Sequence, residues 1–340
     1  MTDLEKLADL RTSVLCGGPG VEREVSLASG DTVFTTLRDA GFRVEKAVLP
    51  EEGFEAFLED LDCQVAVMML HGEFGEDGRP QAVLEKKGIA FTGSDSRTCS
   101  LAMNKNSTKR LFRYTGIPTP DWVLIDGPDH ASALVEDAGL TLPLVIKPNS
   151  RGSSVGVTIV RDVSEIHAAV EKALMVDSLA LAEKFVAGRE VTVGWLNGEF
   201  LPVIELAPDG VFYDYNAKYL SSKTEYRCPA SLDDGTMSRI ECVMERILQN
   251  LSLRDLARVD ILIGSSGPQV LEINTSPGFT SHSLVPLAAR QAGIGMKALC
   301  CSLVEMAARR GGLLEDVVAG GGADSFFAES TSVFPRQRTA

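Results

Sequence analysis

Short apolar runs alternate with amphipathic segments along the first hundred residues. Three runs have strand length: 13–16, 44–49 and 65–70. The segment 24–40 instead has helical spacing, so the alternation predicts a parallel α/β layer. Gly-rich loops follow two of the strands, at 17–20 and 71–78. Such sheets bind ligands at the carboxyl ends of their strands, so we expect substrate contacts from this domain.

Beyond residue 96 the pattern predicts two further units. Helical segments at 97–103 and 106–115 lead to a breaker cluster at 116–120. A smaller α+β unit follows, with strands expected at 144–147, 155–160 and 179–185 and a helix at 163–175. The third unit has expected strands at 190–196 and 200–204, an irregular stretch at 207–230, and helices at 236–251, 284–292 and 296–309. No internal repeat is visible.

Residues 258–274 form the most informative segment, two apolar strands joined by a Gly/Ser/Pro turn. With Gly264 to Pro268 as the loop, Asp260 lies opposite Glu272, and Arg258 opposite Asn274, on one face. Opposed carboxylates, with Cβ atoms about 5 Å apart, destabilise a sheet unless something neutralises them. A divalent cation held jointly by protein and nucleotide, with open positions for phosphate oxygens, suits this pair. An ordinary hairpin with a solvated polar face is the alternative.

Composition narrows the class of protein. The chain has 340 residues, 44% of them hydrophobic, so it can bury a substantial core and form two or three domains. Its net charge of −14 disfavours nucleic-acid and anionic-lipid partners. No apolar run approaches a membrane span of about 20 residues, and the start lacks a basic region followed by an apolar stretch. Seven scattered cysteines show no zinc or disulfide pattern. We therefore expect a cytoplasmic enzyme that binds neither nucleic acid nor membrane.

Two further motifs indicate a nucleotide. The Gly/Ser-rich segment 149–156 lies between apolar strands, where flexible backbone can place N–H groups around phosphates. It lacks the Walker A pattern, but Lys147 on the preceding strand can reach phosphates as a point charge. The segment 183–190 predicts a strand that leads into a turn with acidic ends, suited to adenine and ribose. A ligand-free Gly/Ser loop and a charged turn are the alternatives.

Together, these segments resemble an ATP-grasp ligase, and more narrowly the D-alanine–D-alanine ligase family. The likeness covers about 300 residues in order, without the first dozen and the tail after Arg310. The motifs that carry it are 15–18, 22–27, 70–72, 75–78, 102–105, 145–148, 152–156, 213–219, 258–260 and 272–283. The resemblance implies a three-lobed ATP-grasp architecture: an amino-terminal parallel α/β substrate domain (1–104), a central lobe (105–187), a carboxy-terminal lobe with the metal site (188–317) and a flexible tail (318–340).

The resemblance implies that ATP phosphorylates one D-alanine on its carboxylate and that the amine of a second D-alanine attacks the acyl phosphate. The dipeptide, a peptidoglycan precursor, is the product, and the resemblance also implies a homodimer. Residues implied to bind ATP are Lys105, Lys147, Ser153, Glu183, Lys184, Val186 and Glu190. Those implied to coordinate two Mg²⁺ ions, or Mn²⁺ in their place, are Asp260, Glu272 and Asn274.

The same resemblance implies the substrate contacts. Glu22 would hold the first D-alanine by its ammonium, with His71 close by. Arg258 and the N–H of Gly278 would stabilise the oxyanion. Lys218 and Ser283 would take the carboxylate of the second D-alanine. A set formed by Glu22, Ser153 and Tyr219 would carry the proton from the amine.

Several alternatives stay open. A satisfied loop histidine is the alternative interpretation of His71, and a residue that closes the irregular segment over the site is that of Tyr219. Tyr213 and Tyr215 are interpreted as packing residues. Asn104 replaces the aspartate usual before the lysine, with a minor effect expected on helix capping. The tyrosine at 219 favours a dipeptide product, since ester-forming relatives tend to carry phenylalanine. The rivals are a ligase that uses D-lactate or D-serine and a catalytically silent nucleotide-binding regulator.

Overall fold

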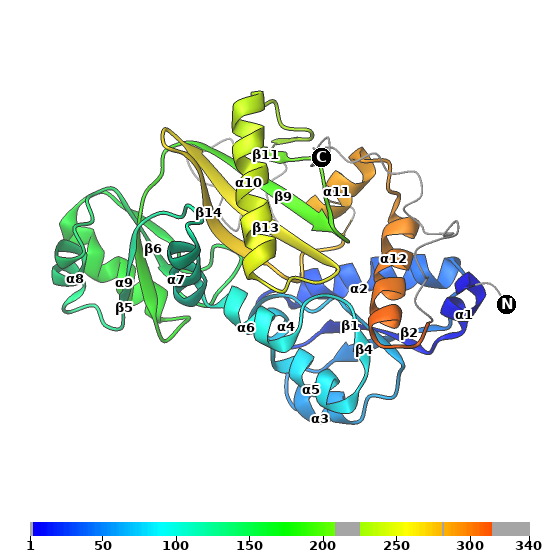
Figure 1. Cartoon of the computed structure of the whole chain (residues 1–340). Helices are drawn as coiled ribbons and strands as arrows, with labels where there is room; N and C mark the ends of the chain where they lie inside the picture. The colour runs from blue at the N-terminus through cyan, green and yellow to red at the C-terminus, as the bar shows by residue number, and fades with distance from the viewer. Residues whose placement is uncertain (1–2, 208–224, 281, 315–340) are drawn as a thin grey trace.

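The computed structural model describes residues 3–207, 225–280 and 282–314, and every structural statement below refers to these. Figure 1 shows three lobes, with the central lobe at one end and the amino-terminal lobe at the other. Lys218, Tyr219, Tyr213, Tyr215 and the predicted tail lie outside the described residues. Within the described part, no helix is both long and apolar enough to cross a membrane.

The amino-terminal lobe is a parallel sheet with helices on its faces, as predicted. Its strands, in the order β2-β1-β3-β4, are β2 (Val44–Leu49), β1 (Thr12–Gly17), β3 (Val65–Met68) and β4 (Ala90–Phe91). Its helices are α1 (Asp3–Asp9), α2 (Arg23–Asp39), α3 (Phe54–Glu59), α4 (Gly72–Glu76), α5 (Arg79–Lys87) and α6 (Ser96–Met103). Every residue of β1 is buried, because helices cover both faces of a parallel sheet. β1 and β3 are parallel, so the Gly-rich segments that follow them leave the same edge of the sheet. The predicted loop at 71–78 is wrong in part, because residues 72–76 form α4.

The central lobe is an antiparallel sheet reached through α7 (Lys105–Thr115). Its strands, in the order β5-β8-β6-β7, are β5 (Trp122–Ile125), β8 (Ala180–Lys184), β6 (Leu144–Pro148) and β7 (Thr158–Val160). Its helices are α8 (Ala131–Asp137), the 3-10 turn η1 (Val163–Glu165) and α9 (Ile166–Leu174). Ile166 and Val170 of α9 are buried against Leu144 and Ile146 of β6 in one cluster, which holds the helix on the sheet.

The carboxy-terminal lobe is a second antiparallel sheet. Its strands, in the order β12-β11-β9-β13-β14 with β10 beside β9, are β12 (Glu225–Arg227), β11 (Ile204–Ala207), β9 (Arg189–Leu196), β13 (Leu256–Gly264), β14 (Gly267–Asn274) and β10 (Glu199–Phe200). Its helices are α10 (Asp234–Asn250), α11 (Leu284–Gln291) and α12 (Met296–Arg310). The predicted single strand at 200–204 is wrong. It is split into the end of β10 and the start of β11, and Pro202, between them, has no N–H for a ladder. The elements α1, α3, α4, α5, β4, β5, α8 and β12 were not predicted, and β12 lies within the predicted irregular stretch at 207–230. The predicted strand at 155–160 is shorter, since β7 begins at Thr158.

The hydrophobic cores do not follow the predicted lobe boundaries. Leu299 and Leu303 of α12 share a core with Val14 and Val65 of the amino-terminal sheet. Figure 1 shows α12, in orange, beside that sheet. Phe112 of α7 is buried in the core of the carboxy-terminal lobe, although α7 leads into the central one. The chain therefore crosses between lobes more than once, and the domain limits at 104, 187 and 317 stay predictions.

Candidate active site

The β13–β14 hairpin has the register that the sequence predicts at its functional end. Asp260 pairs with Glu272, and Arg258 pairs with Asn274. The predicted five-residue loop is wrong, because Gly264 already pairs with Gly267 and only two residues turn the chain. The register shifts by one residue at a bulge between Asp260 and Ile261, which the sequence did not predict. The wrong loop length and the missed bulge offset each other, so the pairing of Asp260 with Glu272 is as predicted.

The bulge also changes which side chains reach the ligand side of the hairpin. In a regular strand, neighbouring side chains point to opposite faces. Leu271 and Glu272 are neighbours, yet both line the same pocket, since the extra residue lies at this point of β14. The bulge therefore places the apolar Leu271 and the charged Glu272 on the same wall of the pocket.

Protein cations already neutralise the opposed carboxylates. Asp260, which is 4% exposed, accepts from Arg258 Nε and Nη2, both at 2.9 Å. Thr192 Oγ1 donates to Asp260 at 2.6 Å, and Asn274 Nδ2 donates to it at 3.1 Å. Glu272 pairs with Lys105 Nζ at 3.3 Å. Arg258 and Lys105 therefore pair with these acids in the structure, and the expectation that a metal ion neutralises them stays a prediction.

A pocket of about 590 Å³ opens between the central and carboxy-terminal sheets. Val145, Phe185, Leu206, Leu262 and Leu271 give it apolar walls suited to a flat base. The predicted nucleotide and metal residues that line it are Lys105, Lys147, Glu183, Lys184, Val186, Glu190, Asp260 and Glu272. The volume, the apolar walls and the gathered lysines together match a nucleoside triphosphate.

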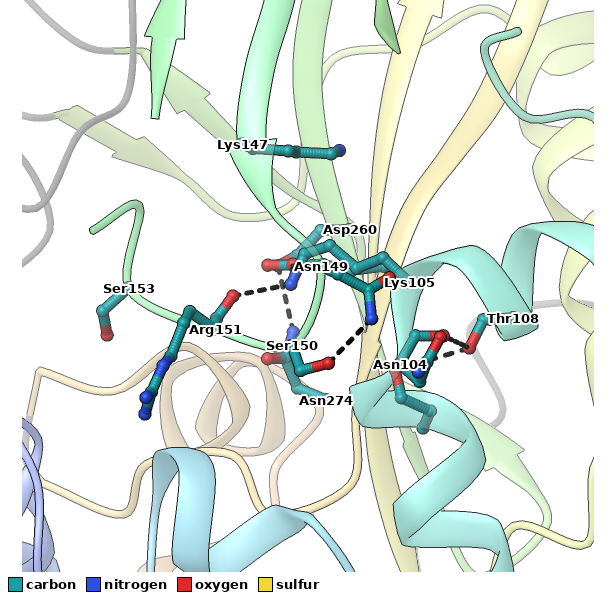
Figure 2. Close-up of polar contacts among 12 residues, drawn as sticks. Asn104, Lys105, Thr108, Lys147, Asn149, Ser150, Arg151, Ser153, Asp260 and Asn274 are labelled. Atoms are coloured by element: carbon teal, nitrogen blue, oxygen red, sulfur yellow. Dashed lines mark hydrogen bonds and ion pairs between the residues drawn. The ribbon is translucent and has the colours of Figure 1, made fainter. Parts of the chain in front are cut away.

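The loop at 148–156 closes one side of this pocket. Lys105 Nζ donates to the Arg151 carbonyl at 2.6 Å, and Figure 2 shows this contact next to Asp260. Asn149 holds the start of α7, because its carbonyl and side chain accept from the N–H groups of Lys105 and Asn106. Asn104 caps the same helix, since its side chain accepts from Ser107 N at 2.9 Å, so the predicted capping role is confirmed.

Glu183 is held by two lysines. Lys147 Nζ lies 2.8 Å from its Oε1, and Lys109 Nζ lies 2.7 Å from its Oε2. Burial alone would raise the pKa of Glu183, but the two ammonium groups more than offset this and leave its pKa below the ordinary value. Glu183 was predicted from the sequence as an adenine contact, whereas Lys109 was missed. The signal was present, because Lys105 and Lys109 are spaced to lie on one helix face.

A second pocket, of about 430 Å³, lies between the amino-terminal lobe and the hairpin. The predicted residues that line it are Glu22, His71, Ser153, Arg258, Glu272, Asn274, Gly278 and Ser283. Ser153 thus lies in this pocket, while its neighbour Ser154 lines the first, so a direct contact of Ser153 with ATP stays a prediction. Lys218 and Tyr219 lie outside the described residues.

The Glu22 side chain reaches this pocket by packing directly against the backbone of Gly72. A Cβ on Gly72 would lie 2.0 Å from Glu22 Oε2, and the φ of Gly72 is +70°, so only glycine fits there. Ser153 donates its hydroxyl to the other carboxylate oxygen of Glu22. Ser153 and Ser154 have φ values of 54° and 57°, a strained conformation for residues with a side chain. The loop is thus held in an uncommon shape where it meets Glu22.

His71 bridges two loops with both ring nitrogens. Its Nδ1 lies 2.9 Å from the Ser276 carbonyl, and its Nε2 lies 3.0 Å from Ser29 Oγ. Ser29 Oγ also accepts from Phe279 N, so its hydroxyl is available to donate to Nε2, and Nδ1 carries the proton. Burial lowers the pKa of His71 to about 4. His71 therefore lines the pocket and also meets the description of a satisfied loop histidine.

Glu76 is a pocket residue that the sequence reasoning quoted within a motif but gave no role. It lines the second pocket and accepts from the N–H groups of Gly72 and Ser276, both at 3.2 Å. Burial and the nearby charge of Glu22 raise its pKa to about 7. Two acidic groups thus lie side by side where a substrate ammonium is expected.

Gly278 and Ser283 lie together at the start of α11. A Cβ on Gly278 would lie 2.9 Å from Ser283 Oγ, which in turn accepts from Thr280 N at 2.9 Å. Gly278 is half-buried and lines the same pocket as Arg258 and Ser283. A backbone N–H and a guanidinium are suitable donors for an oxyanion.

Two antiparallel sheets around a nucleotide-sized pocket, next to a parallel α/β domain with a second pocket, define an ATP-grasp enzyme. A family model described as "D-ala D-ala ligase C-terminus" matches residues 111–305. Because this match covers more than half of the chain, and the relatives described below are similar over most of it, the chain belongs to the D-alanine–D-alanine ligase family.

The relatives are similar over nearly the whole chain. A D-alanine–D-alanine ligase of Mannheimia succiniciproducens is 38% identical over 90% of this chain and 100% of its own. One of Laribacter hongkongensis is 42% identical over 87% of this chain and 96% of its own. The crystal structure of the Bacillus anthracis ligase complexed with ATP matches with a TM-score of 0.79 at 32% identity, covering 90% of this chain and 99% of that one.

A ligase of different acceptor preference has a similar fold. The VanG D-Ala:D-Ser ligase of Enterococcus faecalis matches with a TM-score of 0.75 at 28% identity, covering 88% of this chain and 99% of that one. Fold similarity alone therefore does not choose between acceptors.

Proposed function

We propose that this protein ligates two molecules of D-alanine with ATP to give D-alanyl-D-alanine, ADP and phosphate. One observation carries the proposal: Glu272 lines both the nucleotide pocket and the second pocket. A phosphate in the first pocket and an amino-acid carboxylate in the second would therefore meet at this hairpin. Such proximity is the main requirement for phosphoryl transfer.

We assign the larger pocket to ATP. The apolar walls would hold adenine, with Lys184, Val186 and Glu190 around the base and ribose and Glu183 near the base. Lys105 and Lys147 would contact the phosphates, since both line the pocket, Lys105 beside Glu272 and Lys147 beside Glu183. The two ammonium groups would balance the negative charge of the ATP phosphates, both before phosphoryl transfer and as further charge develops on them in the transition state.

The donor set fits magnesium. Asp260 and Glu272 offer carboxylate oxygens and Asn274 offers an amide oxygen, which are hard ligands on two rigid strands. The described residues hold no group of three or more His, Cys, Asp or Glu side chains arranged for a metal, so phosphate oxygens and water would complete the coordination. Two Mg²⁺ ions, or Mn²⁺, bound there would neutralise phosphate charge. Arg258 and Lys105 would turn toward the substrates when the carboxylates take up metal.

The second pocket is assigned to the amino acids. Glu22, with Glu76 beside it, would hold the ammonium of the first D-alanine, whose carboxylate oxygen attacks the γ-phosphorus as ADP leaves. The amine of the second D-alanine then attacks the acyl carbon, loses a proton, and phosphate departs. Arg258 and the Gly278 N–H would stabilise the oxyanion between these events. His71 would hold the loop that carries Gly278 through its contact with Ser276.

The remaining roles concern the second D-alanine, and two of the residues assigned to it, Lys218 and Tyr219, lie outside the described part. Lys218 and Ser283 would bind the carboxylate of the second D-alanine. Glu22, Ser153 and Tyr219 would carry the proton away from its amine, a proposal supported by the Ser153–Glu22 contact. The dipeptide would serve peptidoglycan synthesis in the cytoplasm, in keeping with seven free cysteines among the described residues, and the enzyme would act as a homodimer.

The test is product analysis. Purified protein with ATP, Mg²⁺ and an equimolar mixture of D-alanine, D-serine and D-lactate should give D-alanyl-D-alanine as the main product by mass spectrometry. Release of ADP should require D-alanine. A mixed product with D-serine or D-lactate would assign the acceptor differently, and the absence of any D-alanine-dependent turnover in folded protein would favour the silent regulator.

A further inference from the structure

Lys109 is a fully buried lysine behind the nucleotide pocket. Its exposed fraction is 0%, and it lies one helical turn after Lys105 on α7. Its ammonium contacts Glu183 Oε2 at 2.7 Å and Thr119 Oγ1 at 2.5 Å, and it lies 5.1 Å from the centre of the Trp122 ring. The pocket wall is formed by Glu183 and Lys147, in front of it.

Burying an ammonium group costs free energy even when it is paired. Burial lowers the pKa of Lys109 to about 8, although Glu183 opposes that shift. A structural role alone is one explanation, because Thr119 also donates to the Val270 carbonyl and so links Lys109 to β14. The charge count in the cluster indicates a second role.

Lys109, Lys147 and Glu183 form a buried group with two positive charges and one negative charge. Asp121, the other acidic group near Lys109, is exposed and pairs with Arg113. Glu183 gives one oxygen to each lysine, at 2.8 Å from Lys147 and 2.7 Å from Lys109. Without Lys109, Lys147 and Glu183 would be a neutral pair. With Lys109, the group keeps one positive charge in excess. Lys147 is the lysine of the two that lines the pocket, so the excess is presented to the ligand there.

We propose that Lys109 is a positioning residue that engages Glu183 from behind and thereby leaves the positive charge of Lys147 available to the phosphates of ATP. This role rests on the proposed assignment of Lys147 to those phosphates. It also requires that Glu183 stays in place when nucleotide binds. Thr119 holds the Lys109 ammonium behind Glu183.

The substitution Lys109→Met keeps the length of the side chain and removes its charge. We expect the Kd for Mg-ATP, measured by titration calorimetry, to rise about tenfold, because one unit charge near the phosphates is lost. The Kd for adenosine, which has no phosphate, should not change. The double variant Lys109→Met/Glu183→Gln removes one charge of each sign. Because Glu183 is also assigned near the base, recovery is measured as the ratio of the Mg-ATP Kd to the adenosine Kd, which should return most of the way to the wild-type ratio. Lys172→Met, at an exposed position of α9 in the same lobe, controls for net charge.

The outcomes separate this inference from the proposed function. If the wild-type protein binds no Mg-ATP, both are wrong. If wild type binds Mg-ATP and Lys109→Met binds it equally well, only the inference on Lys109 is wrong. Loss of adenosine affinity in Lys109→Met, or no recovery in the double variant, would show that Lys109 only maintains the shape of the pocket.

A second measurement applies if Lys109→Met does not fold. The charged groups facing Lys109 are Glu183 on β8, Lys147 on β6 and Asp121 before β5. Because the pKa of Lys109 is lowered to about 8, its charge is lost as pH rises through that value. The wild-type affinity for Mg-ATP should therefore fall between pH 7 and pH 9 while that for adenosine stays constant. An Mg-ATP affinity that is flat over this range would overturn the inference.

Discussion

The hydroxyl of Ser153 donates to the carboxylate of Glu22, which lies 131 positions earlier in the chain. The contact joins the Gly/Ser loop of the central lobe to the first helix after β1, on which Glu22 is the residue before the first turn. One wall of the second pocket therefore exists only while these two lobes are together. The predictions below test the chemistry and packing that depend on this assembly.

Replacing Glu22 by glutamine should weaken the use of the first D-alanine. The carboxylate that would pair with the substrate ammonium is lost, while Ser153 keeps an oxygen to bond. We expect the KM for D-alanine to rise about tenfold or more, with the Kd for ATP unchanged. Steady-state kinetics and calorimetry measure the two. Glu55→Gln, at an exposed position of α3, is the control, and an unchanged KM in Glu22→Gln would contradict the assignment.

Replacing Asp260 by asparagine should weaken the magnesium dependence of ATP binding. Wild-type protein should bind ATP more tightly with Mg²⁺ than with a chelator, because the acids of β13 and β14 would share the ion with the phosphates. In Asp260→Asn this difference should shrink by about tenfold or more. Asp62→Asn, in an exposed ion pair with Arg11, should keep it. A full magnesium effect in Asp260→Asn would show that the metal binds elsewhere.

Acid should destabilise the protein through His71. Its pKa is about 4 in the folded protein, below its ordinary value of 6.5, so the unfolded chain binds the proton more tightly. The stabilising effect is complete above about pH 6.5 and is lost as pH falls toward 4, by about 3 kcal/mol in all. Urea unfolding of wild type and His71→Asn across pH 4 to 7 measures this. The difference between the two proteins should narrow as pH falls, and a constant difference would contradict the prediction.

Truncating Phe112 should lower the free energy of unfolding, because this side chain packs α7 into the core of the carboxy-terminal lobe. Phe112 is 0% exposed in that core, and its replacement by alanine should cost about 3–5 kcal/mol of unfolding free energy. Tyr114, two residues later on the same helix, is 90% exposed, so Tyr114→Ala should change stability by less than about 0.5 kcal/mol. Equal effects of the two substitutions in denaturant titrations would show that α7 is not anchored as described.

Local pattern was sufficient for much of the fold. The boundaries of β2 were predicted to the residue, and α2, α6, α7 and α12 to within one residue, because apolar periodicity and Gly or Pro breakers mark them. The interruption at Pro202 was missed, since the apolar residues on both sides of it form one strand-like run. The hairpin loop was misjudged because a bulge leaves no distinct sign in the sequence.

The sequence by itself determined which side chains share a face within each strand of the hairpin. The period of two sets Arg258 with Asp260, and Glu272 with Asn274, whatever surrounds them. The two-residue turn and the bulge, seen only in the structure, bring both pairs to one face. Only the tertiary structure decided which cation each acid meets: Lys105 with Glu272, and Lys109 with Glu183. Backbone geometry is local, whereas Coulomb attraction and desolvation depend on distances and burial that arise only when separate elements pack together.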